Sequence, residues 1–488
     1  MPRLSQSLLP QITVPKPACD RATLTVGIVH FGVGGFHRAH EAVYLDDLMN
    51  AGKARDWGIC GVGLLPGDAR MRDALVPQDC LYTVVTRDAE GDRARVVGSL
   101  VQYLLAPDSP EAVLARLAAP ETRLVTLTIT EGGYNTDFHT GEFDMAHSGV
   151  VHDLAHPDQP VTVFGYLAEG LARRRRDGTA PFTVLSCDNI QGNGAVTANC
   201  MQAFTNARDP QLAAWIEENV TFPSCMVDRI TPQTTDAERA LVRDEFGIDD
   251  QWPVVCEPYQ QWVIEDKFCN GRPPLQDVGV QMVADVRPYE TMKLRLLNAG
   301  HSALGYLGWL VGYHTIDRVA SDPQFQSFLR ELWDNEVTPL LPPVPGVDLD
   351  EYKATLLTRF ANPRIADQVS RICLDGSSKM PKFLLPSLHE QLAQNGPHRA
   401  LTLATAGWLR YLAGRDEQGQ PYPIDDPQAA LLQARALEGG ADPRPLLSVR
   451  SVFGDLIDNS AFVQELGRVL ELLYTQGARA TLTTHLGG

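Results

Sequence analysis

The first half of the chain alternates short apolar runs with helical stretches, and this alternation constrains the fold more than any other feature. Residues 24–31 (LTVGIVHF) form a β-branched run that stops at a glycine-rich turn, after which FHRAHEAVYLDDLMNAG continues with helical periodicity. Further strand-like runs are WGICGVGLL, LYTVVT, ARVVGSL, LVTLTIT and FTVLSCD, and helical stretches such as SPEAVLARLAAP and VFGYLAEGLARRRR separate several of them. The pattern predicts an α/β fold with a doubly wound sheet.

Beyond about residue 285 the strand-like runs largely disappear. Long amphipathic stretches replace them, including PQFQSFLRELWDNEVTPLL and SAFVQELGRVLELLYTQG, with proline- and glycine-rich loops between. We therefore expect two domains, an α/β domain over residues 1–285 and a mostly α-helical domain over residues 286–488.

The turn after the first run has the form of a dinucleotide-binding turn. Gly32 and Gly34 fit the first two glycines of the G-x-G-x-x-G fingerprint, but His37 stands at the third, so an ordinary tight turn is a competing interpretation. Asp68, after the second run, is placed to accept hydrogen bonds from the adenosine ribose, which would favour NAD over NADP. His37 and His40 lack a familiar pattern of metal ligands, and we expect no metal there.

A second candidate site lies in YETMKLRLLNAGHS, just past the expected domain boundary. Spacings of five and three residues place Lys293, Asn298 and His301 roughly on one side of a predicted helix. A cation, an amide and an imidazole suit the interconversion of an alcohol and a carbonyl, which needs a proton carrier and donors for the developing alkoxide. The competing interpretation is a solvated lysine, a capping asparagine and a packed histidine.

Composition favours a small-molecule partner. The chain has 488 residues and a formal charge of −18, from 60 acidic and 42 basic residues, which disfavours nucleic acid and anionic membranes. The basic run 173–176 suits a helix C-terminus facing water.

Cysteine usage and the N-terminus indicate a cytoplasmic protein. The nine cysteines include no CxxC pair, so we expect free thiols and neither a disulfide framework nor a zinc-cysteine site. We see no signal peptide and no apolar run long enough to span a bilayer.

Taken together, the motifs resemble those of the polyol-specific long-chain dehydrogenases, the mannitol dehydrogenase family. The most specific is VTFPSCMVDRITP at 220–232, with its VDRI core. GVGGFHRAH, LTITEGGY, SCDN, CEPYQQWVIEDKF, KLRLLNAGHS and DGSSKMPKF look like further family blocks in the expected order. The resemblance implies a Rossmann-type NAD-binding domain, a helical domain for substrate binding and catalysis, and no catalytic metal.

The resemblance also implies residue roles. Lys293 would be the general base in alcohol oxidation and, protonated, the acid in ketone reduction, while His301 would orient the substrate. Asn189 and Asn298 would form an oxyanion pocket. Asp228 would accept polyol hydroxyl groups, and Arg371 and Lys379 would donate to them; an ion-pair role is the competing interpretation for these two cations. Glu290 would tune the pKa of Lys293 or control the exit of its proton; a surface carboxylate is the competing interpretation. The expected cofactor contacts are Gly32, Gly34, Gly35, Phe36, Asp68, Thr130 and Glu131.

The expected reaction is NAD-dependent interconversion of D-mannitol and D-fructose by hydride transfer at C2. Gly132 in TEGGY favours a neutral sugar, because a lysine there would suit a uronate. Reduction of D-fructuronate to D-mannonate stays open, because ARDPQLAAWIEENVTFP and GWLRYLAGRDEQG resemble the reductase branch of the family. Oxidation of D-arabinitol or D-sorbitol also stays open. A ligand-binding module without turnover is the alternative from another class. We expect a monomer, since no heptad seam demands association.

Overall fold

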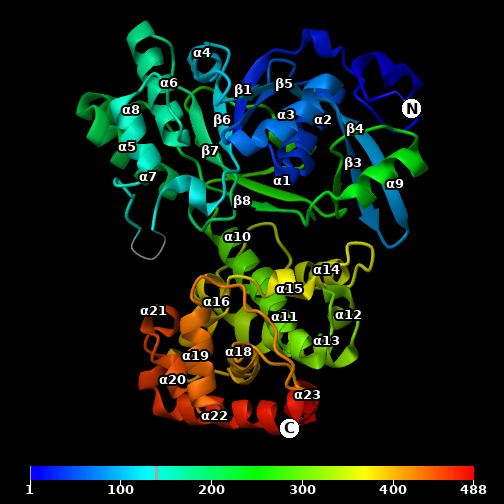
Figure 1. The fold of residues 1–488 in the computed structure, drawn as a ribbon, viewed down its shortest axis with the longest axis vertical. Helices are drawn as coiled ribbons and strands as arrows, with labels where there is room; N and C mark the ends of the chain where they lie inside the picture. Colours follow the sequence, from blue (N-terminus) through cyan, green and yellow to red (C-terminus); the bar gives the residue numbers. More distant parts are fainter. Residues whose placement is uncertain (1, 138–140, 488) are drawn as a thin grey trace. The chain divides into compact units, whose positions relative to one another are not determined.

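The structure is a computed structural model that describes residues 2–137 and 141–487. The chain folds into two compact units, residues 1–286 and residues 287–488, each with its own fold (Figure 1).

The first unit is built on a parallel sheet of five strands in the order β5-β2-β1-β6-β7. Its strands are β1 (Val26–Phe31), β2 (Gly58–Gly63), β5 (Leu100–Leu105), β6 (Leu124–Leu127) and β7 (Thr183–Ser186). In register, Ile28 of β1 lies opposite Leu124 of β6 and Ile59 of β2. The central strand β1 is buried along its whole length, as expected for a parallel strand covered on both faces.

Helices cover both faces of this sheet (Figure 1). Ile28 and Ile59 share one apolar core with Leu48 of α2, while Val29 and Val62 share another with Leu167 of α6. The prediction of a doubly wound α/β domain is therefore confirmed. The helices of this unit are α1 (Gly35–Ala39), α2 (Glu41–Asn50), α3 (Ala69–Leu75), α4 (Pro110–Ala118), α5 (Ser148–Ala155), α6 (Val163–Asp177), α7 (Asn193–Arg208), α8 (Pro210–Asn219) and α9 (Asp236–Phe246).

Two smaller sheets complete the first unit. One contains β3 (Tyr82–Asp88), β4 (Gly91–Val97) and β9 (Val254–Cys256); the other contains β8 (Cys225–Asp228), β10 (Gln261–Glu265) and β11 (Gln281–Val283). The predicted strand ARVVGSL actually spans the end of β4 and the start of β5. The break falls at Gly98, where an added Cβ would lie 2.5 Å from the Pro17 ring.

The second unit is helical, and its central element is α11, which packs against α12, α13, α15, α16, α18 and α23. This confirms the prediction of a mostly helical second half. Its elements of four or more residues are α10 (Arg287–Met292), η7 (Lys293–Asn298), α11 (Ala299–Val311), α12 (Ile316–Ala320), α13 (Pro323–Glu331), η8 (Leu332–Val337), α14 (Leu349–Phe360), α15 (Val369–Ile372), α16 (Gly376–Phe383), α17 (Leu385–Gln394), α18 (Arg399–Tyr411), α19 (Ala429–Gly439), α20 (Arg444–Leu447), α21 (Arg450–Phe453), α22 (Ser460–Thr475) and α23 (Gly477–Gly487).

The arginine run ends a helix, as predicted, but it does not simply face water. Helix α6 stops at Asp177, and Gly178 adopts a left-handed conformation with φ +68°. The side chain of Arg174 is buried and donates to the carbonyl oxygens of Leu117, Thr122 and Ala180. The Arg174 side chain therefore links the end of α6 to three carbonyl oxygens on neighbouring segments, a role that a pattern of charges does not reveal.

All nine cysteines are free thiols, as predicted. Among the described helices, none combines the length and apolar character needed to cross a lipid bilayer.

A cluster of buried polar side chains joins β1, β6 and the first two helices. Thr126 Oγ1 donates to Glu41 Oε1 at 3.0 Å, and His30 Nδ1 lies 3.2 Å from Glu41 Oε2. The rings of His30 and His37 stack with centroids 3.5 Å apart. No hydrogen bond to either nitrogen of His37 is found among the described residues. Burial, aided by His30, Arg38 and His40, lowers the pKa of His37 well below its ordinary 6.5.

Acid should therefore destabilise this protein partly through His37. The unfolded chain protonates His37 as the pH falls below 6.5, whereas the folded state resists, so the unfolding free energy drops by up to about 1.4 kcal/mol per pH unit from this group. Urea unfolding at pH 7.5 and 5.5 should show a smaller loss in His37→Phe than in the parent protein. His156→Gln, at an exposed position, is the control. An equal loss in His37→Phe and the parent would contradict this assignment.

Candidate functional site

The order of the parallel strands creates an open edge at their carboxyl ends. Strand β1 lies between β2 and β6. The helices that follow β1 and β2 pack on one face of the sheet, whereas the helix α6 that follows β6 packs on the other. Such a switch point is where open α/β sheets bind ligands. The predicted residues Gly32, Asp68, Thr130 and Asn189 follow β1, β2, β6 and β7 in turn, so the fold brings them to one edge.

The turn after β1 requires glycine at its first position. Gly32 has φ +92°, and a Cβ there would lie 2.0 Å from the carbonyl oxygen of Thr128. Gly34 precedes α1 as its N-cap, and Gly35 is the first residue of that helix. The ring of Phe36 stacks on His40 at 4.8 Å. The turn therefore lies directly against the start of the loop that follows β6.

His37 occupies the place of the third fingerprint glycine, whose usual purpose is close packing of helix on strand. Here the imidazole of His37 lies flat on that of His30, with an angle of 13° between the rings. A glycine at this position would let the backbones of α1 and β1 pack closely. In this protein the stacked rings of His30 and His37 form the contact between α1 and β1 instead.

The predicted single helix after the turn is in fact two helices. His40, with φ −123° and ψ −91°, separates α1 from α2. A ring nitrogen of His40 lies 2.9 Å from the carbonyl oxygen of Gln261, and this contact holds the break.

Asp68 lies beyond the end of β2 in a short turn, Pro66–Asp68. Its Oδ2 accepts the backbone N–H of Leu65 at 2.9 Å, and its backbone carbonyl accepts from the hydroxyl of Tyr103 at 3.3 Å. The side chain is half-buried. These contacts give the carboxylate a defined position at the carboxyl edge.

Thr130 has an unusual backbone conformation, with φ +59° and ψ 172°. That region is essentially restricted to glycine and costs about 1–3 kcal/mol for other residues. The N–H groups of Thr130 and Ile129 donate to the Asp188 carboxylate at 2.9 and 3.0 Å. The following residue, Glu131, is exposed.

Asn193 links the loop after β7 to strand β8. Its amide Nδ2 donates to the carbonyl oxygens of Asp188 (3.1 Å) and Cys225 (2.8 Å), and its Oδ1 accepts the N–H of Cys225 (3.0 Å). Asn189 therefore follows a tethered residue, while Asp228 ends the tethered strand. Asn189 is exposed, whereas Asp228 is buried.

In the second unit, Lys293 begins a π-helical segment, Lys293–Asn298, within an otherwise continuous helix. Residues five apart would lie roughly 140° from each other around an α-helix, so a regular helix would not place Lys293 and Asn298 on one face, contrary to the prediction from their spacing. In a π-turn, hydrogen bonds close from i to i+5, as from the N–H of Ala299 to the carbonyl of Leu294. The wider turn brings Lys293 and Asn298 closer to one face than an α-helix would.

The carbonyl oxygen of Leu296, within the π-helical segment, accepts the indole N–H of Trp333 at 2.9 Å. This bond satisfies a backbone group in the irregular turn. Such segments are frequent at functional sites.

The side chains of Lys293, Asn298 and His301 are all buried. Within the described chain, Nδ2 of Asn298 has no hydrogen-bond partner. A buried amide donor in this state costs roughly 1–3 kcal/mol, which makes it a candidate for binding an oxygen atom of a ligand. His301 stacks on Phe360 with ring centroids 3.9 Å apart.

The two predicted cations of the helical unit lie on elements that pack near this segment. Helix α16, which carries Lys379, packs on the π-helical segment, and α15, which carries Arg371, packs on α11. Arg371 is exposed and pairs with Asp367, with Nε 2.6 Å from a carboxylate oxygen, and this pairing raises the pKa of the guanidinium. Lys379 is half-buried.

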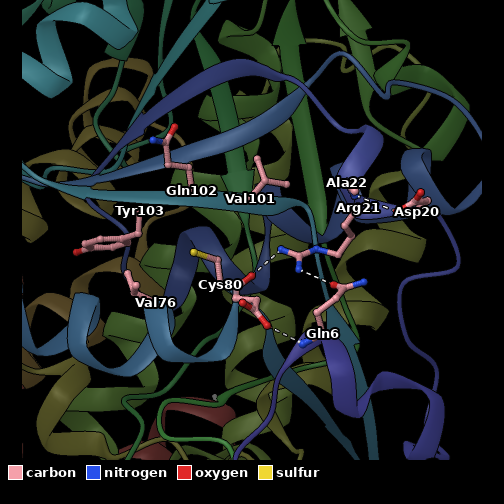
Figure 2. A pocket seen from close by; sticks show the side chains of 10 residues that line it. Gln6, Asp20, Arg21, Ala22, Val76, Cys80, Val101, Gln102 and Tyr103 are labelled. Carbon is pink, nitrogen blue, oxygen red and sulfur yellow. Dashed lines mark hydrogen bonds between the residues drawn. The ribbon is translucent and has the colours of Figure 1, made fainter.

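A surface hollow of about 560 Å³ near β5 is filled from one side by Arg21 (Figure 2). This arginine donates to the side chain of Gln6 and to the carbonyl oxygens of Gly98, Asp79 and Leu100. Its bonds tie the N-terminal segment to the sheet, which is a structural role.

One group of side chains in the described chain has the proximity of a metal site: His30, His37 and Glu41. However, the imidazole rings are nearly parallel and 3.5 Å apart. An ion placed between their nitrogens would lie far out of both ring planes, whereas imidazole binds metals along an in-plane lone pair. The geometry fits a packed polar cluster better than a metal centre.

Sequence reasoning missed Asp188, Asn193 and the π-turn. Asp188 had one signal, since it lies beside Asn189 in SCDN. Its partners are backbone N–H groups almost sixty positions away, which no local pattern reveals.

Comparison with known proteins agrees with this arrangement. The model of the mannitol dehydrogenase Rossmann domain matches residues 26–277, and that of the mannitol dehydrogenase C-terminal domain matches residues 285–474. Mannitol 2-dehydrogenase of Phaeosphaeria nodorum is 50% identical over 98% of this chain and 84% of its own length. Mannitol dehydrogenase 2 of Saccharomyces cerevisiae is 50% identical over 96% of this chain and 94% of its own.

Solved structures give the same result. Mannitol 2-dehydrogenase of Pseudomonas fluorescens, in a ternary complex with NAD and D-mannitol, aligns over the whole of both chains with a TM-score of 0.89 and 46% identity. A D-sorbitol dehydrogenase in substrate-free form aligns over 98% of this chain and 100% of its own, with a TM-score of 0.90 and 39% identity. Family models cover most of the chain, and the fold and the predicted motifs agree with them: the chain belongs to the mannitol dehydrogenase family.

Proposed function

We propose that this protein is an NAD-dependent polyol dehydrogenase that interconverts D-mannitol and D-fructose, with hydride transfer at C2. The observation that carries the proposal is the full-length similarity to the Pseudomonas fluorescens enzyme in complex with NAD and D-mannitol. The arrangement of each unit supports it. The first unit has a glycine turn at a switch point, and the second has a buried lysine in the same π-helical segment as Asn298, whose Nδ2 has no hydrogen-bond partner among the described residues.

The proposed dinucleotide site lies at the carboxyl edge of the parallel sheet. The turn of Gly32, Gly34 and Gly35 would leave room for the pyrophosphate, with Phe36 beside it, and the Asp68 carboxylate would accept the ribose hydroxyl groups. Thr130 and Glu131, after β6, would lie at the nicotinamide half. When bound, NAD supplies the hydride acceptor.

In alcohol oxidation, Lys293 would take the hydroxyl proton as the hydride leaves C2, and in ketone reduction it would return a proton. This requires a neutral amine at the working pH, and hence a pKa below the ordinary lysine value of about 10.4. The burial of Lys293 supports this role, because desolvation disfavours the ammonium form. Glu290, one helical turn earlier and also buried, would tune the pKa of Lys293 or carry the proton of Lys293 outward.

Asn189 and Asn298 would donate their amide N–H groups to the reacting oxygen. Amide donors stabilise alkoxide character without adding charge, and Nδ2 of Asn298 is already buried with no hydrogen-bond partner in the described chain. His301, held flat against Phe360, would orient the substrate.

Further polyol hydroxyl groups would be bound by Asp228, Arg371 and Lys379. Asp228 would accept hydrogen bonds at the end of β8, and Lys379 would donate from α16. Arg371, which already pairs with Asp367, would offer only its remaining N–H groups. In this proposal these three side chains bind the hydroxyl groups of the substrate. The reaction itself would need no metal, because Lys293 transfers the proton and the two amides stabilise the alkoxide. A monomer in the cytoplasm remains our prediction.

Replacing Lys293 by alanine should separate chemistry from cofactor binding. We expect kcat for D-mannitol oxidation to fall by at least about 10²-fold, because the proton carrier is lost, while the Kd for NAD changes less than about twofold. Stopped-flow absorbance and fluorescence titration measure the two quantities. Lys267→Ala, at an exposed lysine paired with Glu265, is the control. Unchanged turnover in Lys293→Ala would remove Lys293 from the mechanism.

Replacing Asp68 by serine should shift the choice of cofactor. Removing the carboxylate deletes a charge-assisted hydrogen bond to the ribose and the repulsion of a 2′-phosphate, so the kcat/KM ratio of NADP to NAD should rise by roughly tenfold or more. Asp73→Ser, on the exposed side of α3, is the matched control. No gain for NADP would exclude Asp68 from the ribose site.

A further inference from the structure

We propose that Asp188 is a positioning residue, whose carboxylate holds Thr130 in its left-handed conformation and thereby sets the loop after β6 for cofactor binding. This inference rests on the proposed function, which assigns Thr130 and Glu131 to the nicotinamide half of NAD.

The Asp188 carboxylate is buried and bonds to a single loop. Its Oδ1 accepts the N–H of Thr130 at 2.9 Å. Its Oδ2 accepts the N–H of Ile129 at 3.0 Å and the hydroxyl of Tyr134 at 2.8 Å. The side chain of Asp188 is 8% exposed. Both oxygens are therefore used, and all three donors lie within residues 129–134.

The loop needs such a partner because of where its glycines are. Thr130 takes the conformation that glycine would adopt freely, yet the two glycines of the loop, Gly132 and Gly133, lie further along. A β-branched residue reaches φ +59° only if the surroundings enforce it. Two charge-assisted hydrogen bonds to consecutive N–H groups provide that force.

The same residue couples two parts of the carboxyl edge. Asp188 precedes Asn189, and its own carbonyl oxygen accepts from Asn193, which also binds β8. Strands β6 and β7 are neighbours in the sheet, so the side chain of Asp188 joins the loops that follow both. A shift of Asp188 would therefore move Thr130 relative to Asn189.

If Asp188 had a purely structural role, its replacement would lower the stability of the protein but would show no specific coupling to Thr130. The two roles differ in a double-mutant cycle, because glycine at position 130 can hold the loop conformation without the carboxylate. We would measure the Kd for NAD by fluorescence titration in the parent, Asp188→Asn, Thr130→Gly and the double variant, each checked for folding by circular dichroism.

Asp188→Asn should raise the Kd for NAD by roughly tenfold or more. The amide has only one acceptor oxygen, and its NH2 group cannot accept from the second backbone N–H. In the Asp188→Asn background, Thr130→Gly should recover at least about threefold of this loss. Recovery of NAD affinity distinguishes positioning from stability. Unchanged NAD binding in folded Asp188→Asn, or no recovery in the double variant, would overturn the inference. If the parent itself bound no NAD, the proposed function would fail instead.

A second measurement covers the case in which Asp188→Asn does not fold. With Asp188 intact, Thr130→Gly should raise Tm, because it removes the strain at φ +59°. Thr358→Gly, on an exposed face of α14, should lower Tm, because glycine disfavours a helix. Because glycine also adds freedom to the unfolded chain in both variants, a fall in Tm for Thr130→Gly as large as that for Thr358→Gly would overturn the inference.

Discussion

The stacking of His37 on His30 is the contact on which the rest of the first unit depends. The stacked rings pack α1 against β1 at the point where the glycine turn begins. Glu41 contacts His30 and accepts a hydrogen bond from Thr126, which extends the cluster to α2 and β6. Gly32 then lies against Thr128 with no room for a Cβ. A chain that lacks the third glycine of the usual fingerprint thus keeps a tight turn by replacing close backbone packing with a stacked pair of aromatic rings.

Both units place irregular backbone where we propose chemistry. In the first unit the left-handed Thr130 is held by the Asp188 carboxylate. In the second, a π-turn begins at Lys293 and ends at Asn298, whose buried Nδ2 has no hydrogen-bond partner among the described residues. Each feature costs free energy in the unliganded protein. In our account the cost is offset when the cofactor and the reacting oxygen bind.

Local pattern is enough to predict the strand-turn-helix start, the parallel sheet and the helical second half, because buried parallel strands form continuous apolar runs and amphipathic helices repeat every 3.6 residues. It failed where the partner is remote. The sequence predicts strands at LYTVVT and ARVVGSL, but it does not show that β3 and β4 pair in a separate sheet. The burial of Arg174 could not be inferred from a run of like charges. The spacing of Lys293 and Asn298 does not place them on one face of a regular α-helix, and the π-turn, which no spacing rule predicts, improves their alignment.

Substrate selection tests the central claim most directly. The measurement is kcat/KM, in EDTA, for NAD reduction with D-mannitol, D-arabinitol and D-sorbitol and for NADH oxidation with D-fructose and D-fructuronate. Our account predicts the highest values for D-mannitol and D-fructose, undiminished by the chelator. Dominant activity on D-fructuronate would contradict it and would mean that Arg371 or Lys379 binds a carboxylate; loss of activity in EDTA would contradict a mechanism based on Lys293 without a metal.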